Sequence, residues 1–189
     1  MISPITFGNK IPCAKCQIRD IRQNKNVEAT LVEFDCKDLS DIDEMAKLNS
    51  DWTYKEDVIS NMIDLYQIHQ MKVPKKSPMA FFALENDNGE IIGFSQIKKE
   101  NPEIVLNFLE SEKNGRYKYI GQNIISCLCS LADSEYFKRI CIPAPTSSAF
   151  NFYTKKCGFR KLYGDCALVM GKFKMNLFQK RLEKRLKSN

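Results

Sequence analysis

Hydrophobic and polar positions follow two different periods along the chain. Period-two alternation and short apolar runs bounded by turn residues are typical of strands. They predict an N-terminal strand or hairpin arm within residues 9–22, whose register is not readable, and a polar turn at 85–90 between two hairpin strands. The expected strands are 9–22, 28–35, 79–84, 91–97, 103–110, 138–142 and a closing hairpin over 159–170.

Elsewhere apolar residues recur every three or four positions, as on the buried face of a helix. Ser40 or Asp41 is expected to cap a first helix, and Thr53 with Glu56 has the capping-box spacing for a second. Two further helices are expected from residue 121 and over 147–156, and a terminal one over 172–187. This order of strands and helices predicts an α/β fold with a mixed sheet in one domain, and one hydrophobic core suffices for 189 residues.

Composition favours an ordered protein without a membrane span. Apolar residues make up 43% and charged residues 28% of the chain, close to globular averages, and charges interrupt every long apolar stretch. Residues 1–8 lack a basic segment followed by an apolar one, so we expect no secretion signal and a cytoplasmic protein.

The net charge of +6 is concentrated at the C-terminus. Residues 171–189 hold seven Lys or Arg against Glu183, and the rest of the chain holds 22 basic and 22 acidic residues. A protein whose body reads a phosphate backbone should be basic throughout that body. We therefore expect no specific nucleic-acid partner.

The eight cysteines are expected to be reduced core residues, because thiols stay reduced in the cytoplasm. Cys13 and Cys16 form a C-x-x-C pair, but no second pair follows and the one histidine is His69. This spacing occurs in zinc knuckles and in redox pairs. An isolated pair is a weak indication of either, and we expect no metal site.

Motifs of several enzyme classes are missing from the sequence. No G-x-S-x-G accompanies His69, and neither a P-loop nor G-x-G-x-x-G occurs. This disfavours a Ser–His–Asp hydrolase, a nucleotide hydrolase and a dinucleotide oxidoreductase. An anion site is still expected over residues 114–122, where a strand leads into a helix N-terminus and Arg116 and Lys118 add two cations.

The same segment carries a family resemblance. Residues 116–121, Arg-Tyr-Lys-Tyr-Ile-Gly, resemble the [QR]-x-x-G-x-[GA] pyrophosphate loop of the GCN5-related N-acetyltransferases (GNATs). Tyr119 stands where the family has Gly. We expect this side chain either to weaken cofactor binding or, if Tyr119 keeps a negative φ and points outward, to be tolerated.

A second likeness lies downstream, over residues 146–159. Ala149, Phe152 and Tyr153 match the GNAT helix N-x-x-A-x-x-F-Y, and Gly158-Phe159 matches its end. Thr146 replaces the Asn. The two motifs lie in the order and spacing of the family.

The resemblance spans residues 79–170 and implies a GNAT-like fold with a mixed, mostly antiparallel central sheet flanked by helices. The acetyltransferase domain would cover 27–170, after an N-terminal arm or extra strand (1–26) and before a basic helix (171–189). It implies an enzyme that moves acetyl from acetyl-CoA to a primary amine of a small molecule or protein by direct attack. Cofactor contacts are expected from Asn107, Phe108, Leu109, Arg116, Tyr117, Lys118, Tyr119, Ile120, Gly121, Gln122, Thr146, Ala149 and Phe152.

Catalytic residues are also implied. An ammonium with a pKa near ~10.4 must lose a proton before attack, and the resemblance nominates Glu110 and Glu112 as the base, with strand parity deciding which faces the site. Each has the alternative of a solvated strand-end charge. Tyr153 matches the acid that protonates the departing thiolate, and a core tyrosine is its alternative.

The acceptor and two rival functions stay open. Residues 41–70 carry seven acidic residues against Lys47 and Lys55, which favours a cationic acceptor. One rival is a non-catalytic CoA-binding or protein-interaction module on the same fold. The other is an interaction surface on residues 172–187, where Phe178, Leu182 and Leu186 recur every four residues. That helix either packs on its own domain with a solvated basic face or contacts a partner or an anionic membrane.

Overall fold

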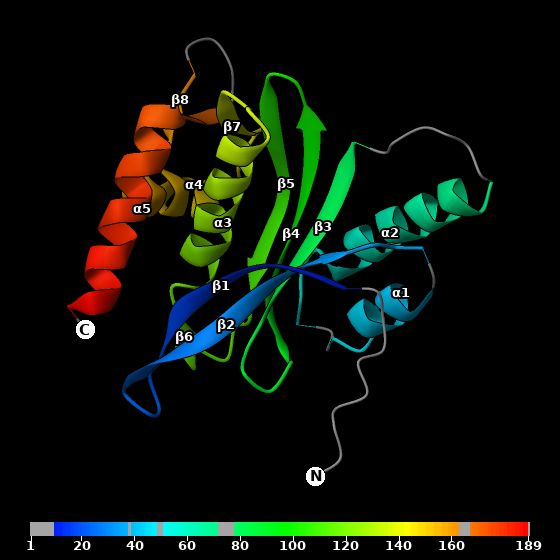
Figure 1. The fold of residues 1–189 in the computed structure, drawn as a ribbon, viewed down its shortest axis with the longest axis horizontal. Helices are drawn as coiled ribbons and strands as arrows, with labels where there is room; N and C mark the ends of the chain where they lie inside the picture. The colour runs from blue at the N-terminus through cyan, green and yellow to red at the C-terminus, as the bar shows by residue number, and fades with distance from the viewer. Residues whose placement is uncertain (1–9, 38, 49–50, 72–77, 163–166, 189) are drawn as a thin grey trace.

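A computed structural model describes residues 10–37, 39–48, 51–71, 78–162 and 167–188 (Figure 1). Within these residues the strands form one nine-stranded sheet in the order β6-β1-β2-β3-β4-β5-β7-β9-β8. The strands are β1 (Ile11–Asp20), β2 (Lys25–Phe34), β3 (Met79–Glu85), β4 (Ile91–Glu100), β5 (Glu103–Ser111), β6 (Tyr117–Lys118), β7 (Arg139–Ile142), β8 (Arg160–Lys161) and β9 (Leu168–Gly171). All neighbours are antiparallel except β5 and β7. The expected mixed, mostly antiparallel sheet is confirmed.

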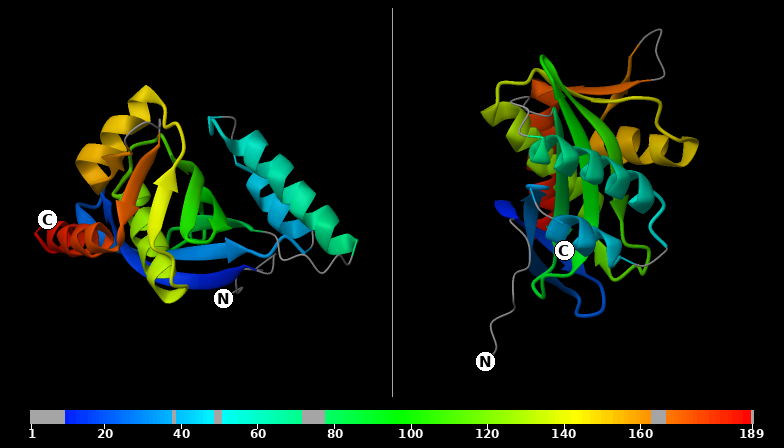
Figure 2. Two further views of the ribbon diagram at one scale, coloured as in Figure 1. Left: turned by 90° about the horizontal axis from the view of Figure 1, so that it is seen from above. Right: turned by 90° about the vertical axis from the view of Figure 1, so that its right-hand side faces the viewer.

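Helices cover both faces of this sheet (Figure 2). They are α1 (Leu39–Ala46), α2 (Lys55–Gln70), α3 (Ile120–Ser134), α4 (Ser147–Asn151), the π-helical turn η1 (Phe152–Cys157) and α5 (Lys172–Lys187). The strands and helices α1 and α2 enclose one apolar core, and α3, η1 and α5 enclose a second on the opposite face. Among the described residues, no helix is both long and apolar enough to cross a membrane.

Both expected helix caps are wrong in detail. Ser40 and Asp41 lie inside α1, and the Asp41 carboxylate accepts the backbone N–H of Cys36 at 2.9 Å. Helix α2 begins at Lys55 without a side-chain cap, so the Thr53 capping box does not form. Local spacing favoured these caps, but before α2 the N–H groups of Thr53 and Tyr54 donate to the Glu110 carboxylate of β5 instead.

A short strand that the sequence did not predict ties the candidate anion loop to the sheet edge. Strand β6 pairs with β1, with Lys118 opposite Arg19. The backbone N–H of Ile21 also donates to the Arg116 carbonyl at 2.8 Å. The N-terminal hairpin of β1 and β2 thereby supports the segment that enters α3.

Strand β5 separates from β7, and near its middle a bulge reverses which face of the sheet its side chains occupy. It pairs with β7 only over Glu103–Val105. Its register with β4 then shifts at Asn107, so that Leu106 packs in the core under α3 whereas Phe108 stacks on Tyr54, with ring centroids 5.0 Å apart. A bulge of this kind reverses side-chain parity downstream. It sets which face Glu110 occupies.

The terminal helix α5 packs on its own domain, which was one of the two alternatives that the sequence left open. Met175, Phe178 and Leu182 are buried, and Leu186 is partly buried. Gln179 of α5 donates to α3, through Nε2 to the Ser126 carbonyl at 3.1 Å and to Ser130 Oγ at 2.9 Å.

Candidate functional site

A cavity of about 340 Å³ opens where β5 leaves β7. Three elements enclose it: the end of β5, the N-terminus of α3, and α4 with η1. Its lining residues are Leu109, Glu110, Ser111, Tyr117, Tyr119, Ile120, Gly121, Gln122, Ala149, Phe152 and Tyr153. The fold thus brings together ten of the residues predicted from the sequence, from motifs about 30 residues apart. Ser111 is the lining residue that sequence reasoning missed, because no motif marks it.

The N-terminus of α3 faces this cavity. Its first helical hydrogen bond joins the Asn123 N–H to the Tyr119 carbonyl at 2.9 Å, so the N–H groups of Ile120, Gly121 and Gln122 have no carbonyl in a preceding turn. Gly121 permits a close approach here, because a Cβ in its place would lie 3.0 Å from Phe152 Cζ. Exposed N–H groups and the helix dipole suit an anion such as a phosphate.

Tyr119 immediately precedes α3 in a left-handed conformation, with φ of 71°. The condition for tolerating this side chain, a negative φ, is therefore not met. A residue with a Cβ is strained here by roughly 1–2 kcal/mol. The amide of Asn123 holds the strained carbonyl, donating from Nδ2 to the Tyr119 oxygen at 3.0 Å and to the Gln17 oxygen at 2.9 Å.

The two predicted cations do not line the cavity. The Arg116 guanidinium binds the buried carboxylate of Asp20, with Nε and Nη2 at 3.1 and 3.0 Å from Oδ2, and lies 4.7 Å from the centre of the Tyr117 ring. Burial alone would raise the pKa of Asp20, but hydrogen bonds from the Gln23 N–H and Arg116 outweigh it and lower that pKa. Lys118 is exposed on β6. Positive potential at the cavity therefore comes from backbone N–H groups.

Tyr153 lies in the cavity wall with its ring locked by neighbours. Phe152 and Phe159 contact it edge-on, with centroids 5.2 and 5.7 Å away, and the residue is 6% exposed. Burial raises the pKa of this phenol, so the hydroxyl stays protonated at neutral pH. Thr146, in contrast, accepts the Ala149 N–H at 3.3 Å as the cap of α4 and does not line the cavity.

Glu110 has both carboxylate oxygens occupied. Oε1 accepts the N–H of Thr53 at 2.7 Å, and Oε2 accepts the N–H of Tyr54 at 2.9 Å. Lys113 Nζ lies 3.6 Å from Oε1. Glu110 thereby fixes the start of α2 to β5. Asn107 and Phe108 also stay outside the cavity lining, since Asn107 is exposed at the bulge and Phe108 packs on Tyr54.

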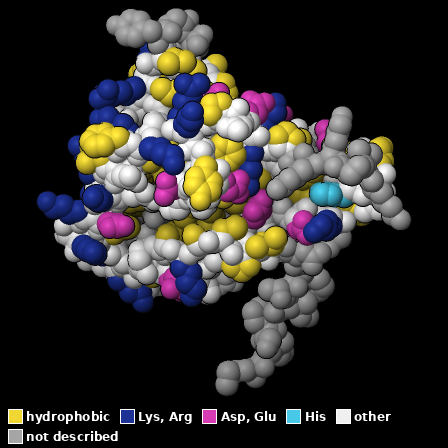
Figure 3. All heavy atoms as spheres, turned by 45° about the horizontal axis from the view of Figure 1, so that its top comes forward, with side chains coloured by type: hydrophobic (Ala, Val, Ile, Leu, Met, Phe, Trp, Pro, Cys, Tyr) yellow, Lys and Arg dark blue, Asp and Glu magenta, His cyan; other side chains and the backbone are white. Residues whose placement is uncertain are grey.

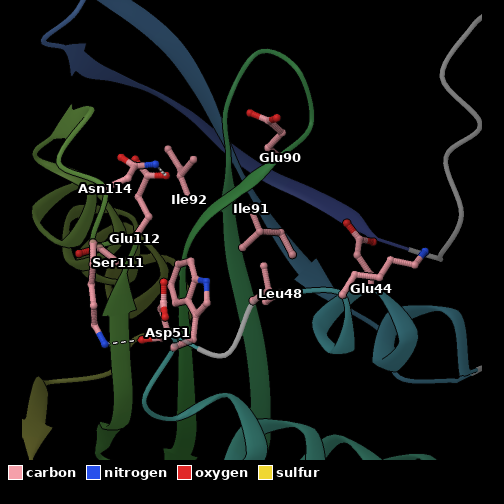
Figure 4. Close-up of a pocket in the computed structure, with 12 residues that line it drawn as sticks. Glu44, Leu48, Asp51, Glu90, Ile91, Ile92, Ser111, Glu112 and Asn114 are labelled. Carbon is pink, nitrogen blue, oxygen red and sulfur yellow. Dashed lines mark hydrogen bonds between the residues drawn. The ribbon is translucent and has the colours of Figure 1, made fainter.

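A second cavity, of about 670 Å³, adjoins the same strand end and shares Ser111 with the first (Figure 4). Its lining residues are Glu44, Lys47, Leu48, Asp51, Trp52, Glu90, Ile91, Ile92, Ser111, Glu112, Lys113 and Asn114. Four of them are acidic and two basic, so the cavity carries net negative charge. Acidic residues of α1, of the turn before β4 and of the segment after β5 thus meet in space although they are distant in sequence.

Glu112 belongs to this second cavity. Its Oε2 accepts from Asn114 Nδ2 at 2.7 Å, whereas its Oε1 is buried and has no hydrogen-bond partner among the described residues. Burial raises the pKa of Glu112, although the Asn114 hydrogen bond opposes this. A carboxylate with an open acceptor oxygen and a raised pKa suits proton uptake.

No cluster of three or more His, Cys, Asp or Glu able to hold a metal occurs in the described part of the chain. The described cysteines are free thiols. Cys13 is exposed on β1, and Cys16 lies beside Cys127 of α3. Cys166 lies outside the described residues.

Comparison with known proteins supports the fold. No protein-family model matches the chain, and a search of curated proteins also finds no match. Among solved structures, one described as FdhC, a nucleotide-linked sugar GNAT without bound ligand, is 13% identical with a TM-score of 0.57, covering 84% of this chain and 94% of its own.

Two further structures are similar to a comparable degree. A GNAT-family acetyltransferase from Staphylococcus aureus Mu50 is 15% identical with a TM-score of 0.55, covering 76% of this chain and 99% of its own. The AtaTR structure bound with acetyl-CoA is 17% identical with a TM-score of 0.55, covering 79% and 96%. Identities this low establish the fold alone. The chain has the GNAT fold that its two motifs predicted.

Proposed function

From a GNAT fold with two cavities that meet at one strand end, we propose that this protein is an acetyl-CoA-dependent N-acetyltransferase. Ser111 lines both cavities, with Tyr153 in the wall of the smaller and Glu112 in the wall of the larger. A transferase needs donor and acceptor on two sides of one reacting point. This juxtaposition carries the proposal, and the structural neighbour described with acetyl-CoA supports the choice of donor.

The 340 Å³ cavity suits the donor. The N–H groups of Gly121 and Gln122 would hold the pyrophosphate, at a place where a Cβ would crowd Phe152. Beyond Val105, no strand of the described residues pairs with β5 on its β7 side, so its backbone near Leu109 can pair with the amides of the pantetheine arm. The donor supplies a thioester, whose acetyl group is open to attack by an amine.

The 670 Å³ cavity suits the acceptor. Its net negative charge attracts an ammonium ion, which must lose a proton before it attacks. The Glu112 carboxylate accepts that proton, and the Tyr153 hydroxyl donates a proton to the departing thiolate. Glu110 holds α2 in place and leaves Glu112 as the base.

A non-catalytic CoA-binding module is the second candidate, and one observation favours it. The ring of Tyr119 stands at the entrance to α3, where the family has a glycine beside the pyrophosphate. A side chain there can restrict the depth of donor binding, and a shallow donor would not reach Tyr153.

The two candidates separate in a pair of measurements on the full chain. Calorimetry with acetyl-CoA reports binding, and release of free thiol with a panel of mono-, di- and polyamines and lysine peptides reports transfer. Binding with transfer to at least one cationic amine is expected. Binding without transfer to any acceptor would favour the module, and lack of binding would overturn both.

A further inference from the structure

The C-terminal part of the fold encloses a narrow cleft whose charged side chains all have one sign. The cleft lies between η1 and α5, measures about 90 Å³, and is lined by Lys155, Lys156, Lys174, Arg181 and Arg185. No Asp or Glu lines it. Figure 3 shows Lys and Arg side chains gathering on the left of the molecule, the side on which Figure 1 shows α5 and β8.

Four of these five cations have no carboxylate partner within the described part of the chain. Lys172, at the start of α5, pairs with Asp133 at 3.3 Å, but Lys155, Lys156, Lys174 and Arg181 form no ion pair with a described carboxylate. Like charges held together repel and lower stability. An anionic partner would relieve that repulsion.

The cations are spaced along a line rather than at a point. Lys174 and Arg181 are two helical turns apart, which places them roughly 10 Å apart along the axis of α5. Lys155 and Lys156 face them from η1. A row of positive charge along a cleft suits a chain of phosphates better than a single small anion.

A membrane surface fits this site poorly. An interfacial helix inserts an apolar face between lipids. The apolar face of α5 is already used inside the protein, since Met175, Phe178 and Leu182 are 3%, 6% and 4% exposed. Outward along the cleft α5 presents Lys174, Arg181 and Arg185, and a single exposed Phe173 does not make an apolar face.

We infer that this cleft binds the phosphate backbone of single-stranded RNA. A narrow cleft admits one strand and not a duplex. Phe173 precedes Lys174 on α5 and is 77% exposed outside the cleft lining, so a base of a strand that leaves the cleft can stack on it. Unpaired strands in cells are typical of RNA loops and ends. The neutral body of the protein argued against nucleic acid, but here the charge is concentrated on one surface. The inference does not depend on acetyl transfer.

The experiment uses the full chain and a fluorescently labelled oligouridylate, with binding followed by anisotropy over a salt series. One variant, Lys156→Gln/Lys174→Gln/Arg181→Gln, removes three cleft cations. The control, Lys180→Gln/Lys184→Gln/Lys187→Gln, removes the same charge from α5 outside the cleft. Oligodeoxythymidylate, duplex DNA and phosphatidylserine vesicles are the competing ligands, and melting curves verify that both variants fold.

The cleft variant is expected to lose at least about 10-fold in affinity, and its slope of log K against log salt to fall by about 2. The control is expected to lose less than about 3-fold, because its cations lie outside the cleft. The inference is overturned by an absence of binding to oligouridylate, by equal losses in the two variants, or by tighter binding to DNA or vesicles. If the cleft variant does not fold, the exposed Lys156→Glu replaces it and must weaken binding more than Lys184→Glu.

Discussion

The carboxylate of Glu110 accepts the backbone N–H of Tyr54 at 2.9 Å, across 56 positions of sequence. Together with the neighbouring hydrogen bond from Thr53, this contact joins the β5 strand end to the start of α2. It determines how α2 meets the sheet beside the larger cavity. It also separates the roles of Glu110 and Glu112, which the family resemblance nominated together.

The first prediction tests that separation by stability. Glu110→Ala should lower the free energy of unfolding by roughly 2–4 kcal/mol, because two N–H groups near α2 lose a charged acceptor. Glu110→Gln should lose less, since its amide oxygen still accepts one of them. Denaturant titration measures both, and a loss below about 0.5 kcal/mol for the alanine variant would exclude the positioning role.

Glu112→Gln should act in the opposite way. It should lower kcat by about 10²-fold or more by removing the base, while leaving unfolding stability at neutral pH unchanged or higher. The sign follows from the raised pKa of Glu112: the folded protein binds a proton more readily than the unfolded chain, so the wild type gains stability as pH falls through that pKa. Thermal melting of wild type and variant from neutral to acidic pH checks this, and a wild type that loses stability relative to the variant over that range would contradict it.

The pH dependence of kcat in the wild type should also report the titration of Glu112. As pH falls through the raised pKa of Glu112, its carboxylate is protonated and the rate should fall. The Glu112→Gln variant should lack that step in the profile of kcat against pH. If the rate falls at the same pH in both proteins, the titrating group is not Glu112.

Tyr119 offers a test of backbone strain. At φ of 71°, Tyr119→Gly should be more stable than Tyr119→Ala by about 1 kcal/mol, because both lose the ring but only glycine relieves the strain. The glycine variant should also bind acetyl-CoA at least as tightly as the wild type. Equal stability of the two variants, measured by denaturant titration, would show that the position is not strained.

Tyr153→Phe removes one hydroxyl and leaves the ring contacts with Phe152 and Phe159 in place. It should lower kcat by about 10²-fold with acetyl-CoA affinity retained. Steady-state thiol release and calorimetry give the two numbers. Normal turnover with a lowered melting temperature would make Tyr153 a structural residue.

Sequence reasoning reached as far as local motifs allow. The strand–loop–helix pattern and the helix with Ala149, Phe152 and Tyr153 gave the fold and most of the smaller cavity, because their spacing along the chain fixes where they lie. It could not show that Arg116 binds Asp20, which is 96 positions away. The bulge at Asn107 was equally hidden, since one extra residue in a strand leaves no composition signal but decides where Glu110 points.

The larger cavity was beyond sequence reasoning for a related reason. Glu44 of α1, Glu90 before β4 and Glu112 after β5 are far apart in sequence, and only the folded sheet brings them to one cavity. The excess of acidic residues over 41–70 indicated a negative electrostatic potential but not where on the fold it lies. For Thr146 the motif position predicted a cofactor contact, but its hydroxyl caps α4 instead.

The central claim is that acetyl-CoA binds at the N-terminus of α3, and calorimetry of a glycine pair tests it most directly. Gly121→Val places branched carbons against Phe152 at the mouth of the smaller cavity, whereas Gly171→Ala adds a methyl where no atom lies within 4 Å. With both variants folded, we expect Gly171→Ala to bind acetyl-CoA like the wild type and Gly121→Val to bind at least about 10-fold more weakly. Wild-type affinity in Gly121→Val would place acetyl-CoA elsewhere and contradict the account.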